Sequence, residues 1–566
     1  MAAHSESTVV ASARRWAEHA PERPIFTWLG EAESEPRTLN AAELYRRVGA
    51  VAGALVELNA RGERVLLLLA PGLDFIVGFL ACLQAGAIAV PAAAPRRSSD
   101  VSRCKDILHH CAARFAIVDE STRRQWGAEL RDSTDASWLD LGELQHAGAR
   151  PPAELPRPSD VAFLQYTSGS TGRPRGVIVT HENLTHNSKA ILALRGDHQC
   201  VGANWLPPYH DMGLIGGVVH PVHSGIHSVL MSPHHFLQRP VRWLEAVTRY
   251  RATVSAAPDF ALRLCAERVS DEQKASLDLS SWRMLICGAE PVRHSTWLEF
   301  VRRFCDVGLD PRVLSPCYGL AESTLLVSGC RWNEEAPFKP VDRAELEQGR
   351  VKAPAENECI VTGCGRPGLG QKVLIANERL EPVAGAEIGE IVVAGPSVAA
   401  GYYADPEATA QCFGVTLSDG SGPWMRTGDL GFVSDGQLFV VGRLKELIKI
   451  RGRNLYATDI EQAARAAHPA VQPAGVAAFS VERAAGEELV VLVEIERQAR
   501  HLPAGEILSA VRQAVGRVHG VNPGGLALLL PSKLPRTTSG KLRRLECRRQ
   551  WLAGSLEVVA EERSAP

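Results

Sequence analysis

Metal-binding and disulfide patterns are missing from this sequence. Thirteen cysteines are spread over 566 residues, and none forms a C-x-x-C pair. Cys359 and Cys364 are the closest two, and no histidine stands nearby to complete a zinc site. An odd number of scattered cysteines is typical of a reducing compartment, so we expect a cytoplasmic protein.

Long apolar runs and a strong net charge are also missing. The most apolar stretch, Val65–Pro95, is interrupted by Pro71, Gly72 and Asp74, so no run reaches the eighteen or so residues that a spanning helix needs. The N-terminus contains acidic residues and no apolar core, which argues against a signal peptide. The formal net charge is −2. We therefore expect no integral membrane association and no nucleic-acid partner.

The pattern that is present in the first 330 residues is alternation of strand and helix. Val65–Leu69 reads as a buried strand, a buried helix follows to about Ala85, and a second strand ends near Pro91. This unit predicts a parallel α/β layer. Further strands are expected at Phe115–Asp119, Val161–Thr167 and Trp282–Glu290.

From about Glu387 the pattern changes to β. A hairpin turned by Asp435-Gly436 is expected, followed after Arg443 by a smaller α+β unit of about 120 residues. In that unit we expect an amphipathic helix near Thr458–Ala467 and a hairpin formed by Ala474–Val481 and Glu488–Glu496. The length alone predicts two or more domains.

One stretch, Tyr166–Gly176 (YTSGSTGRPRG), combines glycines, hydroxyls and arginines directly after an expected strand. Backbone amides at the carboxyl end of a strand, with hydroxyls and cations beside them, suit a nucleotide phosphate. It is not a P-loop, because the spacing and the final Lys-[ST] are absent. A flexible surface turn is the alternative interpretation.

Six other polar stretches follow in order: Asn204–Gly217, Cys287–Val292, Cys317–Thr324, the segments beginning at Arg426 and Gly442, and Leu534–Arg544. Together with the glycine-rich loop they resemble the motifs of the adenylate-forming superfamily of acyl-CoA synthetases, peptide-synthetase adenylation domains and luciferases. The finer resemblance is to the fatty acyl-AMP ligases. Phe338–Pro367 is similar to a segment inserted in these ligases and missing from acyl-CoA synthetases.

The resemblance implies an α/β adenylation domain with a β subdomain over 1–444, carrying an inserted segment at about 338–362. A small mobile α+β domain over 445–566 would follow. It also implies an ATP- and Mg²⁺-dependent enzyme that converts a fatty acid to acyl-AMP. The acyl group would then pass to the phosphopantetheine thiol of a holo acyl carrier protein in a polyketide or lipopeptide pathway.

The resemblance also assigns residues. Lys541, Glu322, His210 and Thr167 would be catalytic, and Glu322 would hold Mg²⁺, which prefers carboxylate oxygen. Tyr318 would stack on adenine, Asp429 and Arg443 would bind the ribose, and Lys541 would contact the α-phosphate and the fatty carboxylate. The full nucleotide-binding set is Thr167, Ser168, Gly169, Ser170, Thr171, Gly172, Arg175, Gly288, Ala289, Glu290, Tyr318, Gly319, Ala321, Asp429, Arg443, Lys445 and Lys541.

Several assignments have competing interpretations. His210 either sits near the carboxylate or gates the acyl tunnel, or it is packed against Tyr209. Glu322 has an alternative as a helix N-terminal carboxylate, and Asp429 has one as a turn residue. Lys445 is either a hinge or a solvated lysine. Arg175 stands where the family usually has lysine, which keeps the charge but changes the shape.

The basic run Pro531–Arg549 reads first as a solvated helix face and second as a docking surface for an acidic carrier. Two rival functions stay open for the whole chain. One is an acyl-CoA synthetase, against which the inserted segment argues. The other is a catalytically silent binding module, against which the presence of Glu322, Asp429 and Lys541 argues.

Overall fold

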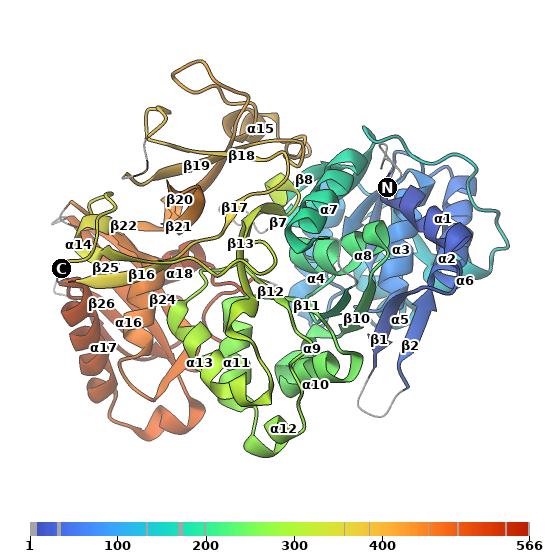
Figure 1. Cartoon of the computed structure of the whole chain (residues 1–566). Coiled ribbons are helices and arrows are strands. Elements are labelled where there is room, and N and C mark those ends of the chain that lie inside the picture. The colour runs from blue at the N-terminus through green and yellow to red at the C-terminus, as the bar shows by residue number, and fades with distance from the viewer. Residues whose placement is uncertain are drawn as a thin grey trace.

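A computed structural model describes residues 8–30, 35–131, 134–167, 174–196, 200–355, 357–383, 385, 387–450, 452–483, 486–537 and 540–563. The chain forms a larger α/β part with a β subdomain and a smaller C-terminal α+β unit (Figure 1). The expected fold class is therefore confirmed.

A six-stranded sheet in the order β6-β5-β3-β4-β7-β8 forms one layer of the larger part. The expected strand–helix–strand unit is present, and its strands β3 and β4 are parallel. Gly86 ends α3 in the left-handed conformation at φ +70, which glycine adopts without a steric penalty. The elements are β3 (Arg64–Leu68), α3 (Leu73–Ala85), β4 (Ile88–Pro91), α4 (Ser98–Cys111), β5 (Phe115–Val118), α5 (Glu120–Arg131), β6 (Ser137–Asp140), α6 (Leu141–His146), β7 (Val161–Thr167) and β8 (Arg175–Thr180).

A nine-stranded sheet in the order β17-β14-β13-β12-β11-β9-β10-β1-β2 forms the second layer. Its central strands β10, β9, β11, β12 and β13 are parallel, so their carboxyl ends meet at one edge, where α/β folds bind ligands. Its strands are β1 (Pro24–Leu29), β2 (Arg37–Asn40), β9 (Val201–Asn204), β10 (His227–Met231), β11 (Val254–Ala257), β12 (Met284–Cys287), β13 (Leu314–Gly319), β14 (Leu326–Gly329) and β17 (Arg366–Pro367).

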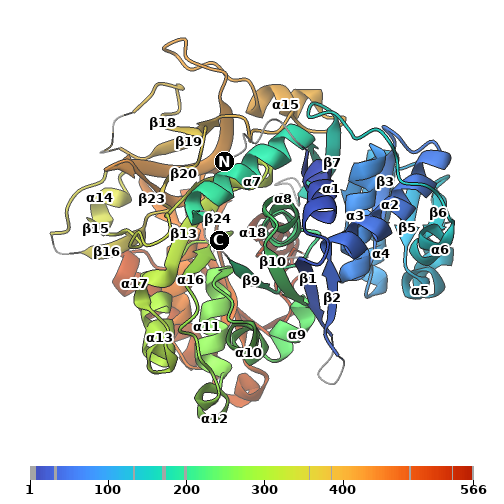
Figure 2. The ribbon, with the colours of Figure 1, turned by 45° about the vertical axis from the view of Figure 1, so that its right-hand side comes forward.

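Helices lie between and around these two sheets. In Figure 2, α7 and α8 occupy the middle of the molecule, and α7 packs against both β8 and β14. A π-helix, η1, runs directly into α8. The helices are α1 (Val9–His19), α2 (Ala41–Glu57), α7 (His181–Arg195), η1 (Met212–Val219), α8 (His220–Ser224), α9 (Pro233–Gln238), α10 (Val241–Tyr250), α11 (Asp259–Arg268), α12 (Asp271–Ala275), α13 (His294–Phe304), η2 (Cys305–Val307), η3 (Pro311–Val313) and η4 (Ala321–Ser323).

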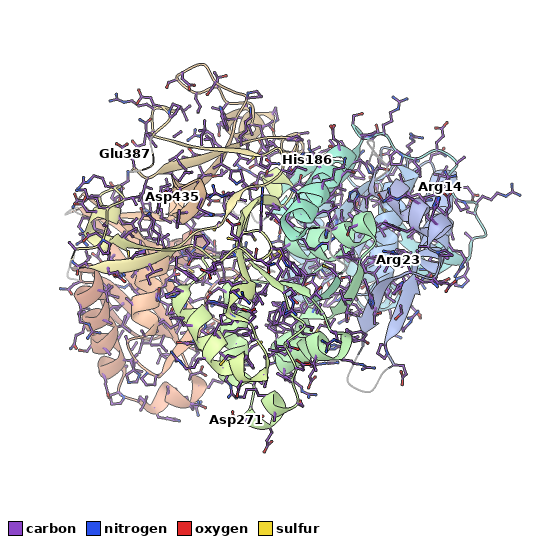
Figure 3. All side chains as sticks on the ribbon, in the orientation of Figure 1. Arg14, Arg23, His186, Asp271, Glu387 and Asp435 are labelled. Carbon is purple, nitrogen blue, oxygen red and sulfur yellow. The ribbon has the colours of Figure 1, made fainter. Side chains whose placement is uncertain are left out.

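The β subdomain is an antiparallel sheet in the order β18-β19-β20-β21. Its hairpin turns at Asp435 (Figure 3) and Gly436, both at positive φ, as a two-residue turn between twisted strands requires. This confirms the hairpin that the sequence predicts. The elements are β18 (Lys372–Ala376), β19 (Gly389–Ala394), α15 (Pro406–Cys412), β20 (Met425–Ser434) and β21 (Gln437–Arg443).

The inserted segment forms a small hairpin with a one-turn helix: β15 (Phe338–Asp342), α14 (Arg343–Leu346) and β16 (Glu358–Thr362). The sequence suggests Ala344 and Leu346 as anchors. Leu346 is buried, but Ala344 is exposed, and Val341 is the second buried residue. Val341 and Leu346 pack with Phe432, Phe439 and Tyr456. The anchors thus sit one on the strand and one on the helix.

The C-terminal unit holds its own core between a sheet in the order β24-β25-β26-β27 and α16 and α17. The expected helix and hairpin are α16 and β24–β25. The elements are η5 (Leu444–Glu446), β22 (Leu447–Ile450), β23 (Arg453–Tyr456), α16 (Ala457–Arg465), β24 (Val471–Arg483), β25 (Gly486–Ile495), η6 (Arg497–His501), α17 (Ala504–His519), β26 (Gly525–Leu529), α18 (Arg544–Ala553) and β27 (Val558–Arg563). No helix in the described part of the chain is long and apolar enough to cross a bilayer.

Candidate functional site

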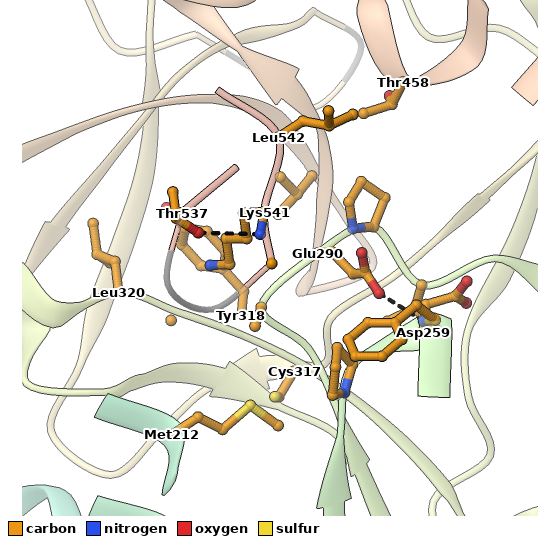
Figure 4. A pocket seen from close by; sticks show the side chains of 18 of the residues that line it. Met212, Asp259, Glu290, Cys317, Tyr318, Leu320, Thr458, Thr537, Lys541 and Leu542 are labelled. Atoms are coloured by element: carbon orange, nitrogen blue, oxygen red, sulfur yellow. Dashed lines mark hydrogen bonds between the residues drawn. The ribbon is translucent and has the colours of Figure 1, made fainter. Parts of the chain in front are cut away.

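A cavity of about 2320 Å³ lies between the larger part and the C-terminal unit. Figure 4 shows residues that line it, from Met212 and Tyr318 of the larger part to Lys541 of the C-terminal unit. The sequence-predicted residues that line it are Thr167, Arg175, His210, Ala289, Glu290, Tyr318, Gly319, Ala321, Glu322, Asp429, Arg443, Lys445 and Lys541. Motifs more than 370 residues apart therefore meet in one space.

Tyr318, Asp429 and Arg443 form a connected polar group. The Tyr318 hydroxyl donates to Asp429 Oδ2 at 2.7 Å, and Arg443 Nε donates to Asp429 Oδ1 at 2.8 Å. Asp429 and Arg443 are register partners on β20 and β21, so the strand pairing fixes this ion pair. Asp429 raises the pKa of Arg443, and burial raises the pKa of Tyr318. Asp429 lies inside a strand, so its alternative interpretation as a turn residue is wrong.

Gly288 and Glu290 follow β12 and take different positions. Gly288 is buried and does not line the cavity: a Cβ there would stand 2.7 Å from Cys317 Sγ, so glycine permits the close approach of β13. Ala289 has φ +68 and is exposed toward the cavity. Glu290 accepts the backbone N–H of Phe260 at 2.6 Å, and burial, followed by the nearby Asp259 carboxylate, raises its pKa.

Glu322 faces the cavity from η4 and accepts a hydrogen bond from the Tyr402 hydroxyl at 2.9 Å. Burial raises the pKa of this carboxyl. The Arg175 guanidinium lies 5.4 Å from the Tyr402 ring centroid, and its Nε is 3.7 Å from Asp405 Oδ2. Tyr402 was not singled out in the sequence, because nothing local marks it. Its partner Glu322 is 80 positions away.

Lys541 lies on the loop before α18, and its side chain is exposed. Its backbone N–H donates to Thr537 Oγ1 at 3.1 Å (Figure 4), and the Thr537 N–H donates back to the Lys541 carbonyl at 2.8 Å. This local turn holds the lysine at the end of a short loop.

His210 lies within the electrostatic reach of Lys541. The pKa of His210 is lowered to about 3, chiefly by burial and then by the charges of Lys541 and Arg103. Its ring centroid is 5.1 Å from that of Tyr209, and it lines the cavity. His210 thus packs beside Tyr209 and also lines the cavity, and its role beside the fatty carboxylate or the acyl tunnel stays a prediction. At pH 7 the ring is neutral.

Thr167 ends β7 opposite Arg175 of the antiparallel strand β8, and both residues line the cavity. Ser168, Gly169, Ser170, Thr171 and Gly172 lie outside the described residues. Lys445 sits in η5, the first turn of the C-terminal unit, and also lines the cavity.

The basic run near the C-terminus is not uniformly a solvated face. Arg544 donates to the Glu461 carboxylate at 2.7 Å and to Glu446 at 2.6 Å, and its side chain is 15% exposed. The interpretation as a solvated face is wrong for Arg544, because its guanidinium pairs with two carboxylates inside the C-terminal unit. Arg549, in contrast, is 71% exposed and fits it.

No cluster of three or more His, Cys, Asp and Glu side chains among the described residues is arranged to hold a metal ion by itself. Mg²⁺ usually keeps several waters and is held by one or two carboxylates together with substrate phosphates. The buried Glu322 carboxylate facing the cavity fits such a site.

Two family descriptions match the chain: "AMP-binding enzyme" over residues 13–403 and "Disco-interacting protein 2-like, AMP domain" over residues 445–561. The medium-chain-fatty-acid–[acyl-carrier-protein] ligase JamA of Moorena producens is 38% identical, over 97% of this chain and 96% of its own length. The long-chain-fatty-acid–AMP ligase FadD32 of Mycolicibacterium smegmatis is 32% identical, over 98% of this chain and 95% of its own length.

Solved structures agree with these relatives. A fatty acid AMP ligase from Legionella pneumophila is 34% identical, covers 98% of both chains and has a TM-score of 0.75. A structure from a study of fatty acyl-adenylate ligases from E. coli and L. pneumophila is 32% identical, with a TM-score of 0.87 over 97% of this chain and 98% of the other. The chain therefore belongs to the AMP-binding enzymes and, within them, to the fatty acyl-AMP ligases.

Proposed function

We propose that this enzyme activates a fatty acid with ATP and transfers the acyl group to the phosphopantetheine thiol of a holo acyl carrier protein. In the first step, the fatty carboxylate oxygen attacks the α-phosphorus and pyrophosphate leaves. In the second step, the thiol sulfur attacks the acyl carbonyl, AMP leaves and the thiol proton is released. The relatives named as fatty-acid–[acyl-carrier-protein] and fatty-acid–AMP ligases support this proposal.

The observation that carries the first step is the position of Lys541. It lines the same cavity as Tyr318, Asp429 and Glu322, and its charge reaches His210. Two anions, the carboxylate and the α-phosphate, must approach each other in adenylation. A cation fixed beside them stabilises the charge of that transition state.

The other residues would bind and orient the nucleotide. The adenine would lie between Tyr318 and the Ala289–Glu290 backbone, and the ribose hydroxyls would donate to Asp429 with Arg443 beside them. Arg175 and the glycine-rich loop would hold the β- and γ-phosphates. Mg²⁺, held by Glu322, would neutralise phosphate charge when bound. Tyr402 positions that carboxylate through its hydroxyl.

The inserted segment supports a restrained C-terminal unit. Glu347, directly after α14, accepts Arg453 Nε at 3.0 Å, and its carbonyl accepts the Asn454 N–H at 2.8 Å. His519 Nδ1 is 3.5 Å from the same carboxylate. The segment thus contacts the β subdomain through Val341 and the C-terminal unit through Glu347. We propose that it limits the swing of the unit about Lys445, which disfavours free coenzyme A and favours a carrier that brings its own docking surface.

Pyrophosphate exchange driven by a fatty-acid ladder, with ATP and Mg²⁺, tests the first step. Holo carrier protein and free coenzyme A, offered in separate reactions, test the second. We expect exchange with at least one fatty acid and thioester formation on the carrier only. Absence of exchange with every acid would favour a silent binding module, and acyl-CoA formation at the rate of carrier acylation would favour an acyl-CoA synthetase. A carrier from a polyketide or lipopeptide pathway is the partner we propose.

A further inference from the structure

One helical face leads through the cavity away from the nucleotide end. Met212, Gly216 and His220 recur every four residues along η1 and α8, and all three line the cavity. This spacing places side chains on the same face of a helix. Met212 lies at the end of the cavity that Cys317 and Tyr318 line (Figure 4). His220 lies eight residues further along the chain, where η1 runs into α8.

The middle of this face is open and its surroundings are apolar. A Cβ placed on Gly216 would meet no atom within 4 Å. The cavity walls around this face come from α7, α8 and the strands nearby, and their apolar residues are Ile191, Leu194, Pro221, Ile226, Leu325 and Leu326. An apolar space that begins beside the reacting carboxylate suits an acyl chain.

His220 breaks this apolar character. Its side chain is 3% exposed, and neither ring nitrogen has a hydrogen-bond partner among the described residues. The pKa of His220 is lowered to about 3, chiefly by burial and then by the charges of Arg195 and His223, whereas the Ser188 backbone, which lies near the ring outside strict hydrogen-bond geometry, acts in the opposite direction. Arg195, from the end of α7, lines the same part of the cavity. The ring is therefore neutral at pH 7, with one N–H donor and one acceptor nitrogen.

A buried polar group without a partner lowers stability, and a ligand that supplies the partner recovers that loss. An all-alkyl acyl chain in the cavity would leave at least one ring nitrogen of His220 unpaired, since among the described residues only the Ser188 backbone acts on the ring as a hydrogen-bonding group. A hydroxyl can accept from the N–H or donate to the other nitrogen, and it fits the space of a methylene with little change in shape.

We propose that the enzyme selects fatty acids that carry a hydroxyl group at the depth of His220, and that this histidine recognises the hydroxyl by a hydrogen bond. The proposal rests on the proposed function, since it names the substrate class of the same site. Recognition by a buried polar group discriminates strongly, because the analogue without the hydroxyl leaves that group unpaired.

The test measures kcat/KM for pyrophosphate exchange with pairs of acids of equal length, one plain and one hydroxylated, with the hydroxyl moved along the chain. We expect wild type to prefer the hydroxylated acid at one depth by about tenfold or more. His220→Leu should lose that preference and gain activity on the plain acid. His220→Gln, which keeps a donor and an acceptor, should retain part of the preference.

His223→Leu is the matched control, because His223 is a buried histidine of the same short helix that bonds Ser12 Oγ at 3.3 Å and does not line the cavity. It should leave the hydroxyl preference unchanged. A wild-type enzyme that exchanges with plain acids and shows no preference at any hydroxyl position would overturn the inference while leaving the proposed function intact. No exchange with any acid, plain or hydroxylated, would remove both. If His220→Leu does not fold, the wild-type position scan decides alone.

Discussion

Two regions at the boundary between the C-terminal unit and the rest of the molecule have opposite character. At the inserted segment the contact is buried: Glu347 is 3% exposed, pairs with Arg453, and lies beside the apolar group of Val341, Leu346 and Tyr456. At the loop of Lys541 the side chain is exposed and the hydrogen bonds run within the loop. We propose that the buried region holds the unit in place and that the loose region carries the lysine that acts on the substrate. Substitutions at the first region should therefore change the placement of the C-terminal unit, and substitutions at the second should change adenylation.

The largest expected effect is at the loose region. Lys541→Ala should reduce acyl-AMP formation by about 10²-fold or more, the scale for loss of one oriented electrostatic group. Transfer from preformed acyl-AMP to the carrier should fall much less. Both half-reactions are measured separately, with Lys533→Ala as the control, since Lys533 lies on the same loop but pairs with Glu557. An equal loss of both half-reactions would contradict the separation.

The next effect concerns Lys445, the proposed hinge of the C-terminal unit. Lys445→Pro fixes φ near −65° and removes a backbone donor in η5. The variant should still adenylate but should transfer about tenfold more slowly or worse, so acyl-AMP accumulates on the enzyme. Lys445→Ala, which keeps the backbone free, is the control. Transfer at the wild-type rate in the proline variant would place the hinge at another residue.

The buried region can be removed as a whole. Deleting roughly Phe338–Cys359, with a short Gly-Ser bridge, should leave adenylation largely intact and raise acyl-CoA formed per acyl-AMP consumed. The deletion also uncovers Phe432 and Phe439, which Val341 and Leu346 cover, so folding is checked by thermal unfolding. An unchanged ratio in a folded, adenylating variant would leave a missing coenzyme A pocket as the explanation.

A point substitution tests the Glu347–Arg453 ion pair without removing the apolar residues of the inserted segment. Glu347→Ala leaves Arg453 without its carboxylate, and we expect a loss of roughly 1–3 kcal/mol in the free energy of unfolding together with a smaller rise in the same ratio. Glu345→Ala is the control, since Glu345 pairs with Arg350 and Lys352 inside the segment. Equal effects of the two substitutions would show that the contact with Arg453 has no special role.

The smallest effect links the two regions. Because Lys541 is one cause of the low pKa of His210, Lys541→Met should raise that pKa by a fraction of a unit, while burial keeps it below 6.5. Histidine NMR titration measures the shift. The pKa of His181, lowered to about 4 by burial, should not move. If Glu347 holds the C-terminal unit in place, Glu347→Ala should also raise the pKa of His210. An unchanged pKa of His210 in this variant would contradict the link between the two regions.

The sequence predicts local structure well here, because short-range patterns determine it. The unit β3–α3–β4, the turn at Asp435-Gly436 and the helix α16 follow from apolar periodicity and turn residues. The family resemblance predicts that the motif residues lie together, and those listed above line one cavity. Gly288 differs, because it packs against Cys317 and does not line the cavity.

Long-range partners could not be predicted in the same way. A charged side chain in a sequence does not indicate which residue it will meet: Glu347 pairs with Arg453 across 106 positions, and Tyr402 meets Glu322 across 80. For the same reason Arg544 was misread as solvated and Ala344 as an anchor. Packing of distant elements decides these contacts, and neither composition nor spacing records it.

Gly216 has a consequence for how such an enzyme changes over generations. A side chain added there enters empty space, whereas at the next residue, Gly217, a Cβ would stand 2.2 Å from Asn204 Nδ2. Substitutions at 216 are therefore tolerated by the packing while each larger side chain takes more of the room beside His220. Since we propose that the acyl chain occupies this space, we expect alanine, valine and leucine at 216 to shorten the accepted chain stepwise.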